Sequence, residues 1–186
     1  MRCGVRSADV DDRGRTLIGR CRLESKEPRN TYQRALLLIG SIGPIGHLPA
    51  SGTLAVAVCG VPLFCAMASW PAWAYVVATV SLTAGSIALH DWGDRMLGTH
   101  DTRTLVWDEL VGFMIAVAFV PFTWRLAIAA VIVERVLDIV KVPPAHWIER
   151  RWPGGWGVVG DDVVAGVYTC GLLHVAIHFG PWFMPG

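Results

Sequence analysis

Charged side chains interrupt the apolar body of this sequence at three places that are far apart along the chain. They are Asp108 and Glu109, then Arg135, Asp138 and Lys141, and finally Asp161 and Asp162. The acidic groups outnumber the nearby basic groups, and clustered carboxylates need positive charge to stay ionised. A hard divalent cation such as Mg²⁺ meets this need, because it binds carboxylate oxygens and keeps several waters. If the three places meet in the fold, they form a cation site.

Each charged group also has a purely structural explanation. Arg135 and Asp138 are three residues apart, so they can pair across one turn of a helix. Acidic residues near the N-terminus of a helix are favoured by its macrodipole, whatever their function. Both acidic pairs are followed by a glycine, Gly112 or Gly166, and small residues allow membrane helices to approach closely. The glycines favour the interpretation in which the two acidic pairs meet.

A glycine-rich segment precedes the second acidic pair. It contains Gly154, Gly155 and Gly157, and an apolar stretch that predicts a helix follows it. Backbone N–H groups in such a turn can bind an anion such as phosphate. Most turns of this composition bind nothing, so the anion-binding interpretation depends on the Asp pair and helix that come next.

The elements that must position these residues are apolar blocks, and 53% of the chain is hydrophobic. A helix needs about 20 apolar residues, with a lower limit of about 17, to cross the hydrocarbon core of a membrane. The blocks that approach or reach this length are 53–69, 72–89, 105–122, 124–140 and 163–179. Block 35–45 is too short, so it is expected to lie in the interface or to re-enter the membrane. The sequence therefore predicts an all-α, polytopic membrane bundle with about five crossings.

The links between the blocks are of two kinds. Links 70–73 and 121–124 are short and aromatic, whereas links 90–104 and 141–162 are long and charged. Five crossings place the two kinds on opposite sides of the membrane. Residues 1–34 carry nine Lys or Arg and five Asp or Glu, so the positive-inside rule assigns the charged side to the cytoplasm. All three charged places then lie at one face of the membrane.

Residues 1–34 are polar, without the apolar segment of a signal peptide. They are interpreted as a disordered basic cytoplasmic tail, and residues 35–186 as the membrane-embedded domain. The five cysteines include no CxxC pair, so no disulfide framework is predicted. The expected location is the inner membrane, with the charged site facing the cytoplasm.

Three ordered motifs resemble those of the phosphatidylglycerophosphatase A family. Segment 101–112 is similar to the family's D-x-x-x-(I/L)-V-x-D-E-x-x-G, and segment 135–141 is similar to its R-x-x-D-x-x-K. Segment 154–166 is similar to G-G-x-G-(I/V)-M-x-D-D-x-x-A-G, with Val159 in place of the methionine. The resemblance implies a phosphatase that converts the membrane lipid phosphatidylglycerophosphate to phosphatidylglycerol and phosphate, with Mg²⁺ as cofactor.

The resemblance also implies roles for individual residues. Metal ligands or a general base would come from Asp101, Asp108, Glu109, Asp161 and Asp162. Phosphate would be held by Arg135 and Lys141, with Arg103, Gly154, Gly155 and Gly157 as further candidates. Asp138 would orient Arg135 or join the metal ligands. Water and an aspartate are both compatible with the role of nucleophile.

Two departures from the family pattern bear on function. The early P-G-T-x-G-S motif survives only as Ser51-Gly52-Thr53 in segment 51–56, and the Pro-x-Pro after the lysine reads Val142-Pro143-Pro144. An early loop that contacts the substrate would therefore give altered specificity or weaker activity. A catalytically altered relative and a small ion-binding or transport protein are the alternatives. Transport predicts charges at the bilayer midplane and an internal repeat, and the sequence has neither feature.

Overall fold

The computed structural model describes residues 31–97 and 105–180, and every regular element in these ranges is a helix. The all-α prediction is confirmed for this part of the chain. In chain order the elements are α1 (Thr31–Gly40), η1 (Ile45–His47), α2 (Ser51–Ala55), η2 (Val56–Gly60), α3 (Val61–Met67), α4 (Ala72–Leu97), α5 (Trp107–Ala116), α6 (Trp124–Val140), α7 (Ala145–Arg151) and α8 (Gly155–Phe179). Residues 1–30 lie outside the described ranges, so the expected tail stays a prediction, although α1 begins within its last four residues.

Two of the described helices are long and apolar enough to cross a membrane. These candidate spans are Ala72–Met96 in α4 and Gly155–Phe179 in α8. Only 11% and 28% of their most apolar windows are buried inside the protein, so most of these side chains face outward. The predicted count of about five crossings is not confirmed, because the other described helices are shorter.

Local features of the chain explain why the other helices are shorter than predicted. The block 105–122 contains α5, which ends at Ala116, and Phe119 then takes a left-handed backbone with φ of 58°. Pro121 follows and has no backbone N–H to continue a helix. The block 53–69 forms one apolar helix, Ser51–Met67, whose middle is the π-helical turn η2. Block 35–45 contains α1 and ends in a turn that leads to η1.

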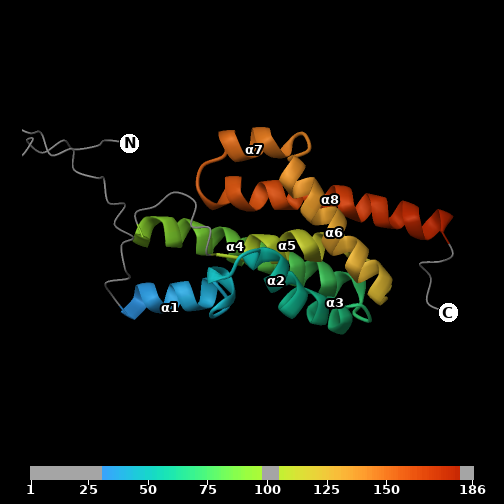
Figure 1. Cartoon of the computed structure of the whole chain (residues 1–186), viewed down its shortest axis with the longest axis horizontal. Coiled ribbons are helices and arrows are strands. Elements are labelled where there is room, and N and C mark those ends of the chain that lie inside the picture. The colour runs from blue at the N-terminus through green and yellow to red at the C-terminus, as the bar shows by residue number, and fades with distance from the viewer. Residues whose placement is uncertain (1–30, 98–104, 181–186) are drawn as a thin grey trace, which may run out of the picture.

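The short helix α5 lies at the centre of the bundle and contacts α2, α4, α6 and α8 (Figure 1). Its Phe113 is fully buried, and the rings of Phe113 and Phe64 on α3 meet edge to face, with 6.3 Å between centroids. Leu126 of α6 and Leu173 of α8 complete the same apolar cluster. If α4 and α8 span a membrane, close packing of this kind would hold the helices together, because lipid tails are as apolar as the side chains.

Three of the exposed tryptophans lie at one end of the bundle. Figure 1 shows the end of α3, the start of α6 and the end of α8 at the same side of the molecule. Trp70, Trp73 and Trp124 belong to this end, and each exposes between 47% and 72% of its surface. Tryptophan favours the headgroup level of a bilayer, since its ring is apolar and carries one N–H donor. The pattern is the one expected for the aromatic links.

Candidate active site

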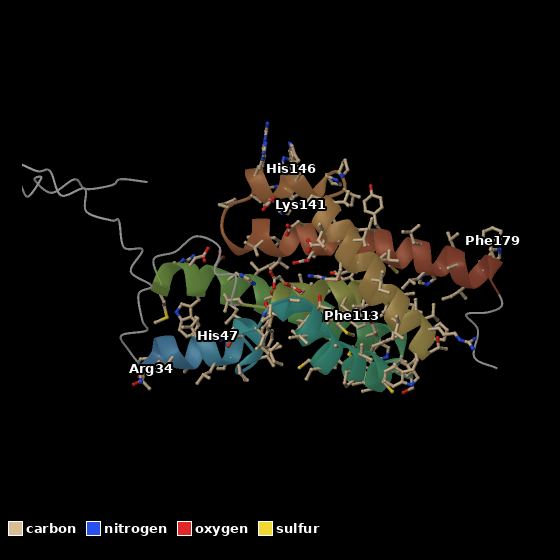
Figure 2. The ribbon with its side chains drawn as sticks, viewed as in Figure 1. Arg34, His47, Phe113, Lys141, His146 and Phe179 are labelled. Atoms are coloured by element: carbon tan, nitrogen blue, oxygen red, sulfur yellow. The ribbon has the colours of Figure 1, made fainter. Side chains whose placement is uncertain are left out.

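A pocket of about 380 Å³ opens where α5, α6, α7 and α8 meet. Its lining includes six carboxylates and one lysine, which are Asp108, Glu109, Asp138, Glu149, Asp161, Asp162 and Lys141. Figure 2 shows side-chain oxygens gathered between these helices, with Lys141 at the upper edge. The three places that are separate in the sequence therefore meet at one pocket.

Asp108 and Glu109 occupy the first turn of α5, where the helix macrodipole favours negative charge. The start of this helix is fixed from outside, since Val106 N–H donates to the carbonyl oxygen of Gly40 at 3.1 Å. Leu105 and Val106 are buried beside it. The first acidic pair thus lies at a rigid helix terminus, in the position that the sequence predicted.

Asp161 and Asp162 lie further inside their helix than the sequence suggested. Because α8 already begins at Gly155, the two acids follow its first turn, beyond the reach of the macrodipole. Only 8% of Asp161 and 5% of Asp162 is exposed. Burial of two adjacent carboxylates needs compensating cations, and two basic residues lie within reach.

The glycine contact between α5 and α8 brings the two acidic pairs together. A Cβ added to Gly166 would overlap the carbonyl oxygen of Gly112. A Cβ added to Gly112 would lie 2.7 Å from Glu134 Oε1 and 3.2 Å from Asp162 Cβ. No larger residue fits at either position without moving a helix. The prediction that these glycines permit close approach is confirmed.

Arg135 stands at the centre of a network of carboxylates. Its Nε and Nη2 atoms donate to the two oxygens of Glu134, each at 2.7 Å, and Nη1 donates to Glu109 Oε2 at 2.6 Å. Asp138 Oδ2 and Asp162 Oδ1 lie 3.6 and 3.5 Å from the guanidinium. One cation therefore compensates four carboxylates that come from α5, α6 and α8.

This network differs from the role that the sequence suggested for Arg135. The expected pairing with Asp138 is present only as a 3.6 Å contact, whereas the direct hydrogen bonds go to Glu134 and Glu109. Among the described residues that line the pocket, Lys141 is the basic one. Arg135 lies behind the carboxylates, where it acts as their counterion.

Lys141 ends α6 in a left-handed conformation, with φ of 50°, and directs its amine toward α7 and α8. Its Nζ lies 2.7 Å from Glu149 Oε2 and 2.9 Å from Asp161 Oδ2. Partial burial alone would lower the pKa of Lys141, but the ion pairs with Glu149 and Asp161 outweigh burial and raise it above the usual value. Lys141 is therefore a permanent positive charge at the edge of the pocket.

Two buried carboxylate oxygens accept no hydrogen bond from the described residues. They are Asp108 Oδ1 and Asp162 Oδ1. His90 Nε2 lies 3.6 Å from Asp108 Oδ1, beyond hydrogen-bond distance. Around the pocket seven carboxylates, Glu134 included, face the two cations Arg135 and Lys141. This donor set suits a hard cation that binds oxygen.

No group of three or more His, Cys, Asp or Glu side chains within residues 31–97 and 105–180 is arranged to hold a metal ion. Mg²⁺ commonly uses one or two carboxylates, several waters and a substrate phosphate rather than a complete protein cage. Asp108 and Asp162 supply carboxylates of that kind. Asp101 and Arg103, which the family resemblance also implicates, lie outside the described residues.

The glycine-rich segment takes a packing role in the structure. Gly154 has φ of 63°, which favours glycine, and precedes α8. The N–H of Gly155 donates to Asp91 Oδ1 at 2.7 Å, and the N–H of Gly157 donates to Gly154 at 3.1 Å. A Cβ on Gly155 would overlap the backbone of Ile87 in α4. In the described structure these amides already have acceptors, and the glycines do not line the pocket.

Sequence reasoning missed four residues around this site. Glu134 is fully buried against Arg135, His90 is 1% exposed beside Asp108, and Glu149 pairs with Lys141. Gly52 is the fourth, because a Cβ there would overlap the Glu109 carboxylate. The charge of Glu134 in an apolar block was a signal for its burial in the bundle. The early loop was noted as a departure from the family, and the structure places it against Glu109.

Comparisons with known proteins support the motif analysis. The family model described as Phosphatidylglycerophosphatase A matches residues 38–177. The Phosphatidylglycerophosphatase A of Escherichia coli (strain K12) is 34% identical over 113 residues, which is 60% of this chain and 64% of that protein. The protein of the same name from Haemophilus influenzae is 37% identical over 74 residues, covering 39% of this chain and 45% of the relative.

A third relative has a name that refers to another lipid. It is a Bacteroides thetaiotaomicron protein for which the name proposes phosphatidylinositol-3-phosphatase activity. It is 40% identical over 88 residues, covering 46% of this chain and 51% of its own. The matched part of the chain thus spans between 45% and 64% of these curated relatives. No solved structure matches.

Proposed function

This chain belongs to the phosphatidylglycerophosphatase A family, and on that premise we propose that it removes the terminal phosphate of phosphatidylglycerophosphate. The products would be phosphatidylglycerol and inorganic phosphate. The observation that carries the proposal is the pocket, in which acidic residues of all three family motifs and the lysine of the second motif face one space. The names of two relatives refer to the same activity.

The basic and the acidic side chains of the pocket have different roles in the proposed reaction. Lys141 attracts the phosphate, because its amine lines the pocket and is held in place by Glu149 and Asp161. Burial raises the pKa of Glu109 to about 7, and the nearby Arg135 opposes this rise. Arg135 is also the counterion of Asp138 and Asp162. Asp108 or Asp162, whose Oδ1 atoms accept no hydrogen bond from the described residues, either takes a proton from water or attacks phosphorus itself.

Both routes break the same bond. In the water route, oxygen from water bonds to phosphorus, the ester P–O bond breaks, and the released glycerol hydroxyl takes up a proton. In the second route the carboxylate first forms an aspartyl phosphate, which water then hydrolyses. The stereochemical course at a chiral phosphorus separates them, because one in-line displacement by water inverts the configuration, whereas two successive displacements retain it.

The donor set fits Mg²⁺, which Asp108 and Asp162 would hold, with Glu109 and Asp161 as neighbouring carboxylates. A bound Mg²⁺ supplies positive charge that neutralises phosphate oxygens and orients the reacting groups. The protein's own contribution is to direct the carboxylates at one space, with Arg135 and Lys141 as their counterions.

The proposal includes a multi-pass protein of the inner membrane whose pocket faces the cytoplasm. The two apolar helices α4 and α8 support membrane insertion. The exposed tryptophans Trp70, Trp73 and Trp124 mark one end of the bundle, whereas the acidic pocket is lined by the end of α6, by α7 and by the early turns of α8. The positive charge of residues 1–34 assigns the other end to the cytoplasm. A lipid headgroup in the cytoplasmic leaflet would then reach the pocket without leaving the membrane.

The test is phosphate release by the purified full chain in detergent or vesicles. We expect release from phosphatidylglycerophosphate that depends on added Mg²⁺ and stops with EDTA. Phosphatidylinositol 3-phosphate and phosphatidic acid, assayed at equal surface concentration, define the headgroup preference. Absence of release from every lipid over a wide range of Mg²⁺ would refute the proposal and favour the catalytically altered relative or the ion-binding protein.

A further inference from the structure

The helix α7 has two faces of different chemistry. Its inner face packs on the first turns of α8, where Ala145 is buried and a Cβ on Gly160 would lie 2.6 Å from Ile148 Cγ2 (Figure 1). Its outer face carries the exposed side chains of Trp147, Arg150 and Arg151. The helix is thus held firmly on one side and presents cations and an aromatic ring on the other.

The positive charge of this outer face is not compensated by acids on α7. The helix contains one acidic residue, Glu149, and that carboxylate is bound to Lys141 at 2.7 Å. Arg151 lies over the ring of Trp147, with 5.5 Å between Cζ and the ring centroid. This cation–π contact orients the guanidinium but leaves its N–H donors for an anion.

Two more tryptophans extend the aromatic surface to the start of α8. Trp152 is 42% exposed and Trp156 is 55% exposed, and their rings meet edge to face with centroids 6.2 Å apart. Trp147 is 52% exposed. Three large rings facing water would be unfavourable, whereas the headgroup layer of a bilayer suits both the rings and their N–H groups.

We propose that this surface, formed by Trp147, Arg150, Arg151, Trp152 and Trp156, binds the anionic headgroups of the bilayer beside the active pocket. The occupant is anionic phospholipid of the membrane itself, because the surface combines arginines that match lipid phosphates with tryptophans that match the interface. The surface also continues directly into α8, one of the two candidate membrane spans.

This anchor would fix the depth of the pocket relative to the membrane. Lys141 and Glu149 join the end of α6 to α7 through their ion pair, so the position of α7 sets the edge of the pocket. A headgroup layer in contact with α7 would place lipid phosphates at the level of Lys141. The inference concerns membrane contact and does not depend on catalysis.

The expected contribution of the two arginines to binding of anionic lipid is a measurable fold-change in the equilibrium constant. Each Lys or Arg near an anionic surface gains about 1 kcal/mol, so Arg150 and Arg151 together correspond to about a 30-fold change in an equilibrium constant. Binding that favours folded α7 lowers the population of its locally opened form, and therefore its rate of hydrogen exchange, by the same ratio. Hydrogen exchange of the α7 amides therefore reports the anchor without any substrate.

The experiment places the full chain in lipid nanodiscs of phosphatidylcholine alone or with 30% phosphatidylserine. Exchange of the α7 amides in wild type should slow by about 5-fold to 30-fold with phosphatidylserine at 50 mM salt. The difference should disappear at 500 mM salt, since the Debye length falls to a few ångströms. Arg150→Gln/Arg151→Gln should abolish the lipid dependence, and Arg150→Lys/Arg151→Lys should retain most of it.

Arg125→Gln is the matched control, because Arg125 is exposed at the opposite end of α6. It should leave the α7 response at the wild-type value. The proposal is overturned if wild-type α7 exchanges equally in both lipids, if salt has no effect on the difference, or if Arg125→Gln removes the difference equally. The wild-type lipid and salt comparisons decide the matter even if the double variant fails to fold.

Discussion

Replacing Gly166 by alanine tests whether the contact between α5 and α8 assembles the pocket. The added Cβ would overlap the carbonyl oxygen of Gly112 and lie 3.1 Å from Ile115 Cβ. A backbone carbonyl cannot rotate away as a side chain can, so the two helices must separate by on the order of 1 Å, and a displacement of that size can cost about 100-fold in rate. We expect a loss of activity near that value.

The same helix offers a matched control. A Cβ on Gly171 would meet nothing within 4 Å. Alanine there gains about 1 kcal/mol of helix propensity, so Gly171→Ala should be as stable as wild type or slightly more stable. Gly166→Ala gains the same propensity but also carries an overpacking cost of about 1–3 kcal/mol. Its expected net loss is therefore between about 0 and 2 kcal/mol.

The assay pairs phosphate release in detergent with thermal unfolding followed by circular dichroism. Gly166→Ala should remain helical, unfold at a somewhat lower temperature and turn over about 100-fold more slowly. Gly171→Ala should match wild type in turnover. Equal activity of the two variants would refute the reasoning, because the pocket would then not depend on the spacing of α5 and α8.

Three further predictions concern the network around the pocket. Gly52→Ala should lower kcat at least about tenfold in the same assay, because its Cβ would displace the Glu109 carboxylate from Arg135. Glu134→Gln should lower the thermal midpoint, because breaking a buried ion pair with Arg135 costs about 3 kcal/mol or more; an unchanged midpoint would contradict the assigned burial. Lys141→Gln should raise KM for the lipid at least about tenfold and change kcat less, since a charge-assisted hydrogen bond contributes about 1.5–3 kcal/mol; unchanged KM would exclude Lys141 from phosphate binding.

The sequence predicted the chemistry of the site better than the number of crossings. Asp108, Asp138 and Asp162 meet because charged residues in apolar helices face the bundle interior, and that rule needs no coordinates. The helix ends were harder to predict. The block 105–122 is apolar after Glu109, and its length suggested a longer helix than α5, which stops at Ala116 ahead of the left-handed Phe119 and of Pro121.

The pairing of particular side chains could not be predicted from the sequence. The pairing of Glu134 with Arg135 joins neighbours that do not face each other in an ideal helix. His90 on α4 lies beside Asp108 on α5, and Glu149 on α7 pairs with Lys141 at the end of α6. Both residues were missed because the sequence does not show that these elements are neighbours. The glycines of segment 154–157 resembled an anion-binding turn, but Asp91 from α4 already accepts from Gly155. Such partners depend on how helices cross, which composition and spacing do not specify.

The most direct test of the account compares Asp162→Asn with Asp94→Asn in phosphate release from phosphatidylglycerophosphate at saturating Mg²⁺. Asp162 lines the pocket and is 5% exposed, whereas Asp94 lies on α4 outside the pocket lining. We expect Asp162→Asn to lose about 100-fold or more of its turnover while remaining folded in detergent, and Asp94→Asn to keep wild-type turnover. Full activity of a folded Asp162→Asn variant would contradict the claim that the acidic pocket is the phosphatase site.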